Sequence, residues 1–536
     1  RPPSGTRINP QILLTRPKYV WVSTTPDASS VPFLSISGLL FVSAVVVLRR
    51  ATLTSVVNAN ANIGIMNRRD FIRNSTMAAS ALMMAPGALA IESGFITVRI
   101  PPSQRRFQSP AVEKTIAEIK SKIRNKELAW MFENCFPNTL DTTVEFAMVD
   151  GRPDTYVITG DIDAMWLRDS SAQVWPYLPL MKNDPKLQQL IAGVINRQTY
   201  CILKDPYANA FYKDENKRGE WASDITDMKP GVHERKWEID SLCYPIRLAY
   251  GYWKESGDAA PFDERWHKSI ALILQTFGEQ QRKSGKGPYS FMRRTEIATD
   301  TVPGRGWGNP AKPCGLIYSI FRPSDDATIF PYLIPANFFA MVSLRQAAEM
   351  VETLKKDSTL AKQCRAMADE VEAALAEHGV VNHPKAGRVY AFEVDAYGNY
   401  YCTDDGNIPS LLSLPYLGAV KQNDPIYQST RRLLLSEDNP YYCVGKAARG
   451  LGGPHVGVDM IWPLGVIMEG LTASDDKEIK ACLMTLQKTH AGTGFIHEAF
   501  HKDDPKKFTR SWFAWANTIF GEFVLKTYRE RPRLLD

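Results

Sequence analysis

Apolar residues spaced three to five positions apart are the feature of this sequence that most constrains its fold. They recur along most of the 536-residue chain, as on the buried faces of helices. Helices are predicted over about 111–135, over 338–354, over 358–378 with Ser358 as its cap, and, after Lys506–Arg510, through Trp512, Trp515, Phe520 and Val524. Strand signals are few, at 144–149 and in a hairpin near 389–401. The chain is therefore predicted to be dominated by helices.

Long loops rich in Gly, Pro, Asp and Asn separate the helical segments, as at 304–315 and 450–457. No Ser/Gly linker and no break in composition divides residues 91–536. This pattern predicts a single large domain over 91–536, a barrel of paired helices in which loops at one end build a pocket.

The charge of the chain is unevenly distributed. The net charge is +6, and residues 1–90 hold nine Lys or Arg and two acidic residues. Residues 91–536 carry 55 basic and 56 acidic residues, so the main part of the chain is electrically balanced. Such a surface gives no electrostatic reason to expect nucleic acid as a partner.

Residues 66–90, MNRRDFIRNSTMAASALMMAPGALA, have the layout of a twin-arginine-type signal peptide. Paired arginines precede a short apolar run, and Ala88-Leu89-Ala90 supplies small residues at the cleavage position. Cleavage after Ala90 is predicted to leave a mature chain that begins near Ile91. The protein is therefore expected to be exported to the periplasm and not stably inserted in a membrane. An amphipathic N-terminal helix is the alternative.

Residues 1–65 precede the first methionine, Met66, and hold an uncharged apolar run from Val31 to Leu48. The run is long enough for a transmembrane helix, yet an anchor ahead of an export signal makes little sense. We predict that 1–65 is upstream sequence that is not native to the protein, with a membrane anchor as the alternative.

The eight cysteines lie beyond residue 130 and form no CxxC pair, so they lack the spacing of metal ligands. Twin-arginine export carries proteins that have already folded in the reducing cytoplasm. Mostly free, buried thiols are therefore expected.

The segment His497-Glu498-Ala499-Phe500-His501 matches the H-E-x-x-H pattern of zinc peptidases. That pattern requires both histidines on one face of a stable helix. Glycines at 492 and 494 and Asp503-Asp504-Pro505 leave room for only a turn or two of helix. We therefore predict no metal site, and a zinc metallopeptidase remains only as an alternative function.

Glu498 has a second possible use, as a proton donor. Aromatic surroundings disfavour a charged carboxylate, and four aromatic residues are near Glu498 in sequence: Phe495, Phe500, Trp512 and Trp515. A glycosidase needs such an acid together with a second carboxylate. Three acidic residues of HERKWEIDS compete for the second role: Glu234, Glu238 and Asp240. Asp240 could equally be the N-cap of the helix predicted after it, and composition does not choose among the three.

Other polar clusters occur beside aromatic residues. The densest is Gly160–Ser171, GDIDAMWLRDSS, and two more are Phe321–Asp326 and Gly453-Pro454-His455. Sugar sites use this mixture, because rings stack on aromatic faces while Arg and Asp take the hydroxyls through paired hydrogen bonds. Asp163 could instead cap a helix predicted over 164–175.

Five segments together resemble family-125 glycoside hydrolases. They occur in the order of that family and span roughly residues 110–530: GDIDAMWLRDSSAQVWPYL, WEIDSLCYPIRLAYGYW, FRPSDDA, GGPHVG with IWPL, and GTGFIHEAFHKDDPKKFTRSWFAWANTIFGE. The resemblance implies an (α/α)6 barrel and an exo-acting α-1,6-mannosidase that inverts configuration and requires neither a metal nor another cofactor. Its partner would be an α-mannoside oligosaccharide from an N-glycan or a mannan.

The resemblance also implies roles for individual residues. Asp240 would be the general base and Glu498 the general acid, at the separation of about 6.5–9.5 Å that is typical of inverting pairs. The residues implied to line the pocket for the terminal sugar are Trp166, Arg168, Asp169, Arg322, Asp325, Asp326 and His455. The alternatives are another (α/α)6-barrel hydrolase of the glucosidase or trehalase kind, or an inactive sugar-binding protein.

Overall fold

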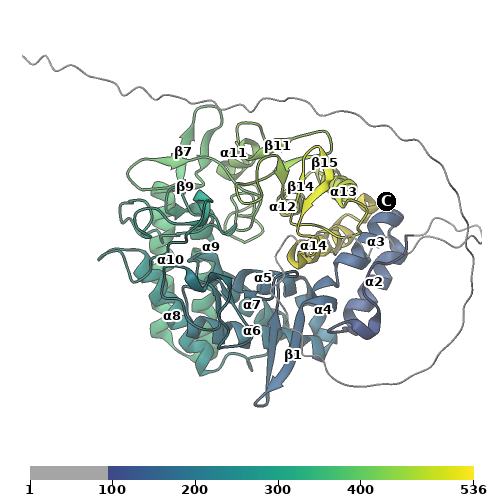
Figure 1. The fold of residues 1–536 in the computed structure, drawn as a ribbon, viewed down its shortest axis with the longest axis horizontal. Helices are drawn as coiled ribbons and strands as arrows, with labels where there is room; N and C mark the ends of the chain where they lie inside the picture. Colours follow the sequence, from purple (N-terminus) through teal and green to yellow (C-terminus); the bar gives the residue numbers. More distant parts are fainter. Residues whose placement is uncertain (1–94) are drawn as a thin grey trace, which may run out of the picture. The chain divides into compact units, whose positions relative to one another are not determined.

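The computed structural model describes residues 95–536, so the predicted upstream segment at 1–65 and the predicted signal peptide at 66–90 lie outside the described residues. Helices dominate (Figure 1). The longer helices are α2 (Pro110–Lys122), α3 (Lys126–Cys135), α5 (Leu167–Val174), α6 (Pro185–Lys204), α7 (Asp240–Ser256), α8 (Glu264–Gln280), α9 (Ile334–Met350), α10 (Ser358–His378), α11 (Pro425–Leu434), α12 (Pro463–Leu471), α13 (Asp476–Thr489) and α14 (Ala514–Glu530). Shorter helical segments are η1 (Pro102–Gln104), α4 (Asn138–Thr142), η2 (Trp175–Asn183), η3 (Glu220–Ser223), η4 (Ala298–Asp300), η5 (Val351–Lys355) and η6 (Pro532–Leu535).

The strands are short and pair antiparallel in small sheets. These sheets are β1 (Val144–Val149) with β2 (Arg152–Val157); β3 (Met165–Trp166), β4 (Ala210–Phe211) and β5 (Val232–Glu234); β10 (Tyr400–Tyr401), β9 (Glu393–Val394) and β6 (Tyr332–Leu333); β7 (Val380–His383) with β8 (Gly387–Tyr390); β11 (Tyr442–Val444) with β12 (Arg449–Leu451); and β13 (Met460–Ile461), β14 (Ala499–His501) and β15 (Asp504–Thr509). The strand predicted at 144–149 and the hairpin predicted near 389–401 are confirmed by β1 and by the β9–β10 pair.

Successive helices pack side by side around a common centre (Figure 1). Helix α7 packs between α5 and α9, while α14 packs on both α5 and α12. A second set lies outside these helices, with α10 on α9, α13 on α12, and α6 on α7 and α8. Because α14 also contacts α3, helices from the two ends of the described chain pack against each other.

Four helices, α5, α7, α12 and α14, begin at or next to residues of the polar and aromatic segments of the sequence. Trp166 directly precedes α5, Asp240 is the first residue of α7, Trp462 directly precedes α12, and Phe513 directly precedes α14. The β3–β4–β5 sheet joins the segment before α5 to the segment before α7 through its backbone pairing. Residues from distant parts of the sequence are thereby brought to one end of the helical assembly.

Three helix predictions are corrected by the structure. The helix predicted over 111–135 is two helices, because the chain is extended at Ile123 and the side chain of Asn125 caps α3 by accepting from the backbone N–H of Leu128. Asp357, not Ser358, caps α10. The last helix begins at Ala514, so Trp512 lies before it, and residues 504–509 form strand β15.

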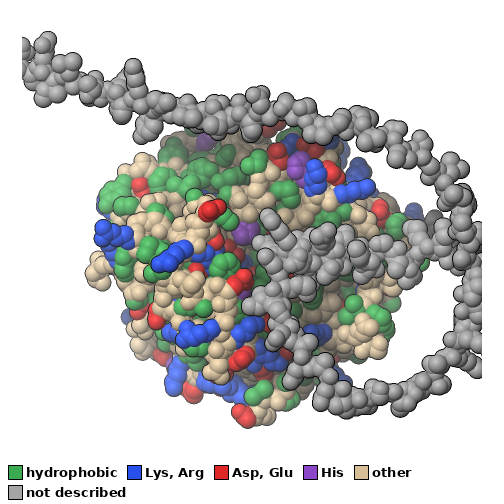
Figure 2. All heavy atoms as spheres, in the orientation of Figure 1, with side chains coloured by type: hydrophobic (Ala, Val, Ile, Leu, Met, Phe, Trp, Pro, Cys, Tyr) green, Lys and Arg blue, Asp and Glu red, His purple; other side chains and the backbone are tan. Residues whose placement is uncertain are grey.

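The buried apolar side chains form one large cluster that runs through the helices, and a small second cluster surrounds Trp166. The eight cysteines, all within the described residues, are free, and five of them are buried, which confirms the prediction for most of the thiols. No helix within residues 95–536 is long and apolar enough to cross a membrane. Acidic, basic and apolar side chains are interspersed over the coloured part of the face in Figure 2.

Candidate active site

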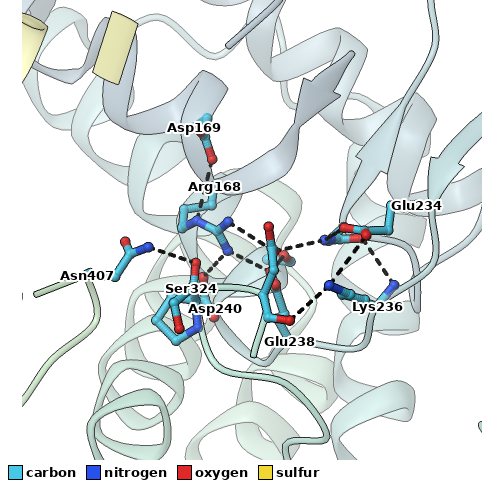
Figure 3. Close-up of polar contacts among 12 residues, drawn as sticks. Arg168, Asp169, Glu234, Lys236, Glu238, Asp240, Ser324 and Asn407 are labelled. Carbon is cyan, nitrogen blue, oxygen red and sulfur yellow. Dashed lines mark hydrogen bonds and ion pairs between the residues drawn. The ribbon is translucent and has the colours of Figure 1, made fainter. Parts of the chain in front are cut away.

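Arg168, in the first turn of α5, lies at the centre of a buried group of carboxylates (Figure 3). Its Nη1 donates to Glu238 Oε2 at 2.6 Å and to Asp240 Oδ2 at 3.3 Å. Its Nε lies 3.4 Å from Asp169 Oδ2, and its Nη2 lies 3.7 Å from Asp325 Oδ1. Four acidic side chains thus share one guanidinium, and part of the group's negative charge is left uncompensated by Arg168.

Asp240 has one oxygen held and one oxygen free. Arg168 binds Oδ2, whereas Oδ1 is buried and has no hydrogen-bond partner within the described residues. Burial raises the pKa of Asp240 to about 6, although Arg168 acts to lower it. The side chain makes no capping hydrogen bond, so the N-cap interpretation is wrong; the N-terminus of α7 nonetheless favours a negative charge there.

The structure separates the three carboxylates that competed in the sequence. Glu234 is held by Arg293 at 2.9 Å and by the Asn209 amide at 3.0 Å, and it serves an ion network of its own. Glu238 joins Asp240 at Arg168, and Ser241 Oγ also donates to its Oε2 at 2.8 Å. Burial raises the pKa of Glu238 far above its ordinary value, with Asp325 and Asp240 adding to the effect of burial and Arg168 opposing it.

Asp325 closes the other side of the cluster from a loop, with a left-handed backbone at φ 67°. Lys236 Nζ donates to the Asp325 backbone oxygen at 2.9 Å, and Asn209 Nδ2 reaches Asp325 Oδ1 at 3.4 Å. Burial works to raise the pKa of Asp325, but Lys236 and Arg168 outweigh it and hold the pKa below its ordinary value.

Arg322 and Asp326 belong to the same loop as Asp325 and lie in a second ion network. Arg322 Nε donates to Glu393 Oε1 at 2.6 Å, while its Nη2 is buried without a partner among the described residues. Ser324 Oγ bridges Asp326 at 3.3 Å and Asp405 at 3.1 Å. Burial raises the pKa of Asp326, and the nearby His455 opposes that shift.

The indole N–H groups of two tryptophans have no hydrogen-bond acceptor within the described residues. They are the buried Nε1–H groups of Trp166 and Trp462. Trp166 packs edge-on against His233, with 5.0 Å between ring centroids, and His455 stacks over Trp462 at 6.1 Å. Each indole is therefore held by a neighbouring imidazole ring while its N–H can still donate to a ligand.

Glu498 lies in the loop that leads into β14 and is 8% exposed. Its hydrogen-bond partner in the described chain is Arg510, whose Nη1 lies 3.4 Å from Oε1. The polar contact of the Glu498 side chain is thus to an arginine 12 residues further along the chain. Asp161, of the GDIDAMWLRDSS segment, binds the same Arg510.

The zinc-peptidase alternative is wrong on geometry. Residues 499–501 form strand β14, so His497 and His501 are not one helical turn apart. His497 stacks on Phe508 at 3.7 Å, and burial lowers its pKa to about 4. His501 Nδ1 accepts from the backbone N–H of Asp503, so both imidazoles have structural contacts.

Several residues of this region were not predicted from the sequence, and the helix-cap interpretation of Asp163 is wrong. Asp163 is exposed, pairs with Lys217 and does not cap α5. The missed residues that contact the predicted ones are Glu393, Asp405, Trp462 and Arg510. Trp462 and Arg510 lie within the quoted IWPL and TRSWF segments, which could have drawn attention to them, whereas Glu393 and Asp405 carry no local signal.

Comparisons with known proteins converge on one family. A family model described as metal-independent alpha-mannosidase, GH125, matches residues 125–525. The meiotically up-regulated gene 157 protein of Schizosaccharomyces pombe is 42% identical over 451 residues, which cover 81% of this chain and 88% of that protein. A solved structure of a metal-independent alpha mannosidase from Streptococcus pneumoniae, in a non-productive complex with α-1,6-mannobiose, is 41% identical with a TM-score of 0.77, and the match covers 80% of this chain and all of the other.

Proposed function

The chain belongs to glycoside hydrolase family 125, the metal-independent α-mannosidases, and we propose that it is an exo-acting α-1,6-mannosidase that inverts configuration. We assign Asp240 as the general base and Glu498 as the general acid. The observation that carries this proposal is the state of Asp240, a fully buried carboxylate with one oxygen fixed by Arg168 and the other unpaired. A fixed carboxylate with a free oxygen is suited to take a proton from a water molecule.

In the proposed reaction, a water oxygen attacks C1 of the terminal mannose as the bond from C1 to the glycosidic oxygen breaks. The water proton moves to Asp240 Oδ1, and the Glu498 carboxyl gives its proton to the departing oxygen. The products are β-mannose and the shortened glycan, and the two carboxyls return to their starting states by exchanging protons with solvent. Because attack and departure occur on opposite faces, the configuration at C1 inverts.

We propose that the unpaired buried N–H groups face the hydroxyls of the terminal mannose. These groups belong to Trp166, Arg322 and Trp462. Arg168 Nε also lacks a hydrogen bond but lies 3.4 Å from Asp169 as an ion pair, and we propose that Arg168 contacts the same sugar. A buried donor without a partner is costly, so a sugar hydroxyl that accepts from it adds affinity and orientation. Asp169, Asp325, Asp326 and His455 surround the same two arginines and the Trp462 ring, and we keep them as substrate-binding residues.

We also propose that the helices form an (α/α)6 barrel. The inner helices of this barrel would be α5, α7, α9, α12 and α14. The outer helices would be α3, α6, α8, α10, α11 and α13. The segment at 410–419, which lies between α10 and α11 in sequence, would take the remaining inner position. Support comes from Tyr244 of α7, which donates to the carbonyl of Ile408 just before that segment.

Export to the periplasm is proposed from the sequence of residues 66–90 alone. The N-terminal sequence of the mature protein recovered from a periplasmic fraction tests it. A start near Ile91 is expected, and retention of the arginine pair in the recovered protein would contradict it.

A panel of mannobioses tests the proposed linkage preference. Free mannose should be released from α-1,6-mannobiose and not from the α-1,2 or α-1,3 isomers. With longer α-1,6-linked chains, mannose should appear before any larger product, because an exo-acting enzyme removes the terminal residue. Equal cleavage of the three mannobioses, or early release of oligosaccharides, would contradict the proposal.

A further inference from the structure

The GDIDAMWLRDSS segment, residues 160–171, contacts both proposed catalytic carboxylates through arginine. Near its end, Arg168 binds Asp240. Near its beginning, Asp161 binds Arg510, which in turn binds Glu498. The contact of Arg168 with Asp240 fixes the proposed base, whereas the contact of Arg510 with Glu498 has no role in the proposed proton transfers.

Asp161 accepts two of the four side-chain hydrogen bonds that Arg510 donates. Asp161 Oδ1 accepts from Arg510 Nε at 2.8 Å and from Nη2 at 2.5 Å. Arg510 Nη2 also reaches Thr159 Oγ1 at 3.2 Å, and its guanidinium lies 4.6 Å from the ring centroid of Phe513. Glu498 receives only the remaining Nη1, at 3.4 Å. Arg510 is thus fixed by residues other than Glu498.

Backbone hydrogen bonds also join the segment around Asp161 to the segment that follows Arg510. The amide of Asp161 donates to the carbonyl of Trp512 at 3.3 Å, and the amide of Ala514 donates to the carbonyl of Thr159 at 3.0 Å. Gly160, at φ 128°, permits this approach, because a Cβ there would lie 2.2 Å from the Trp512 carbonyl oxygen. Arg510 itself has a left-handed backbone at φ 42°, a strained conformation for a residue with a side chain.

A general acid has to be oriented and also protonated, and a bare arginine beside it would favour the ionised form. The Asp161 carboxylate lies against two nitrogens of Arg510 and offsets its charge. Through the single longer bond to Oε1, Arg510 can orient Glu498 while leaving Oε2 to carry the proton.

We propose that Asp161 and Arg510 are positioning residues for the general acid: Arg510 orients the Glu498 carboxyl, and Asp161 neutralises Arg510 so that Glu498 can hold its proton. The inference rests on the proposed function, since it takes Glu498 as the acid. The single segment 160–171 then contributes to both halves of the reaction, with Arg168 holding the base and Asp161 acting on the acid.

The test uses the full chain and two substrates that differ in their need for a proton. α-1,6-Mannobiose has a poor leaving group and requires the acid, whereas 2,4-dinitrophenyl α-mannoside has a leaving group that departs without protonation. Asp161→Asn and Arg510→Gln are each expected to lower kcat on mannobiose about 10-fold or more, and on the aryl mannoside by less than about 3-fold. Arg510→Lys, which keeps the cation, should recover part of the loss.

The pH profiles separate the two roles. With Asp161→Asn the charge of Arg510 is offset less, since of the two carboxylates Asp161 and Asp169 only Asp169 remains near it, so the basic limb of kcat on mannobiose should move to lower pH. With Arg510→Gln the limb should not move in that direction. Asp163→Asn is the matched control on the same loop, because Asp163 is exposed and pairs with Lys217, and its kinetics should match those of the wild type.

Equal losses on both substrates, or an unmoved basic limb for Asp161→Asn, would overturn the inference. Glu498→Gln distinguishes this failure from a failure of the proposed function. If Glu498→Gln loses about 10²-fold on mannobiose and little on the aryl mannoside while the positioning variants do not, only the inference fails. If Glu498→Gln shows no dependence on the leaving group, the assignment of the acid fails as well. Thermal unfolding shows which variants fold. If only one of Asp161→Asn and Arg510→Gln folds, that variant is sufficient for the test.

Discussion

Two buried arginines, Arg293 and Arg168, hold neighbouring groups of carboxylates, and they differ in how completely the groups are paired. The two side chains are equally buried, each 5% exposed. Arg293 binds Asp224 through two bonds at 2.9 and 2.6 Å, and it binds Glu234 and Asp300 at 2.9 Å each. Around Arg168, two carboxylate oxygens, Glu238 Oε1 and Asp240 Oδ1, are buried without a hydrogen-bond partner within the described residues. Arg168 Nε also makes no hydrogen bond there, although it lies 3.4 Å from Asp169 Oδ2 as an ion pair.

This difference distinguishes a structural ion network from a reactive one. A buried polar group without a partner destabilises the folded state, so natural folds satisfy nearly all such groups. The network of Arg293 follows that rule, and Trp221 covers its guanidinium at 3.6 Å. The network of Arg168 departs from the rule where the proposed base must meet water and substrate.

The largest expected effect comes from removing the free oxygen that acts as the base. Asp240→Asn keeps the shape of the side chain and an acceptor for Arg168, but it cannot take a proton. We expect kcat on α-1,6-mannobiose to fall about 10²- to 10⁴-fold with an unchanged circular dichroism spectrum. Glu234→Gln is the paired control from the satisfied network, and it should retain catalysis in the folded protein. Near-normal activity of Asp240→Asn would remove Asp240 from the mechanism.

Removing the arginines should separate stability from activity. Arg293→Met leaves paired carboxylates buried without their cation, and we expect the free energy of unfolding in urea to drop by about 3–5 kcal/mol. Arg168→Met should cost less stability, because Glu238 and Asp240 already have raised pKa values and can take up protons instead. Activity of Arg168→Met should be lost at neutral pH, because a protonated Asp240 cannot act as the base. Equal losses of unfolding free energy in the two variants would contradict the distinction between the Arg293 and Arg168 networks.

The stability of Asp240→Asn should depend on pH in a defined direction. The pKa of Asp240 is raised in the folded protein, so its contribution to stability is fully present below the unfolded pKa and is lost as pH rises through about 6. The neutral variant avoids that loss. The free energy of unfolding of Asp240→Asn should therefore be about 1–3 kcal/mol higher than that of the wild type at pH 7, and the difference should vanish toward pH 4. Parallel pH profiles for the two proteins would count against a buried, ionisable Asp240.

The smallest expected effect is the acid limb of the wild-type rate. The base has to be ionised, and the pKa of Asp240 is about 6, so kcat/KM should fall as pH drops through about 6. Below that point the rate should decline about tenfold per pH unit, because one protonation is involved. A rate that stays constant down to pH 4 would contradict the assignment of Asp240 as this base.

Local signals in the sequence predicted the helical character and parts of the site, but not the pairing within it. The helices α9 and α10 were placed to within a few residues because their apolar spacing is regular. The break between α2 and α3 was missed, because the capping role of Asn125 appears only once the chain turns there. Glu393 was missed because its partner, Arg322, is far away in the sequence, and only the fold brings the two together.

The acidic residues of the HERKWEIDS segment show the same limit. Glu234, Glu238 and Asp240 are equivalent in composition, and a family resemblance was needed to choose Asp240. The structure supplies the physical distinction, since Arg293 satisfies Glu234 while Arg168 leaves Asp240 with a free oxygen. The segment 160–171 likewise proved to contact both proposed catalytic carboxylates through Arg168 and Arg510, which the sequence alone did not indicate.

Proton NMR of the reaction with α-1,6-mannobiose tests the central claim most directly. The pairing of Asp240 as base with Glu498 as acid requires water to attack C1 from the face opposite the leaving oxygen. The anomeric signal of β-mannose should therefore appear first, followed by α-mannose as the free sugar mutarotates. Initial appearance of α-mannose would mean retention of configuration and would contradict the assigned roles of both carboxylates.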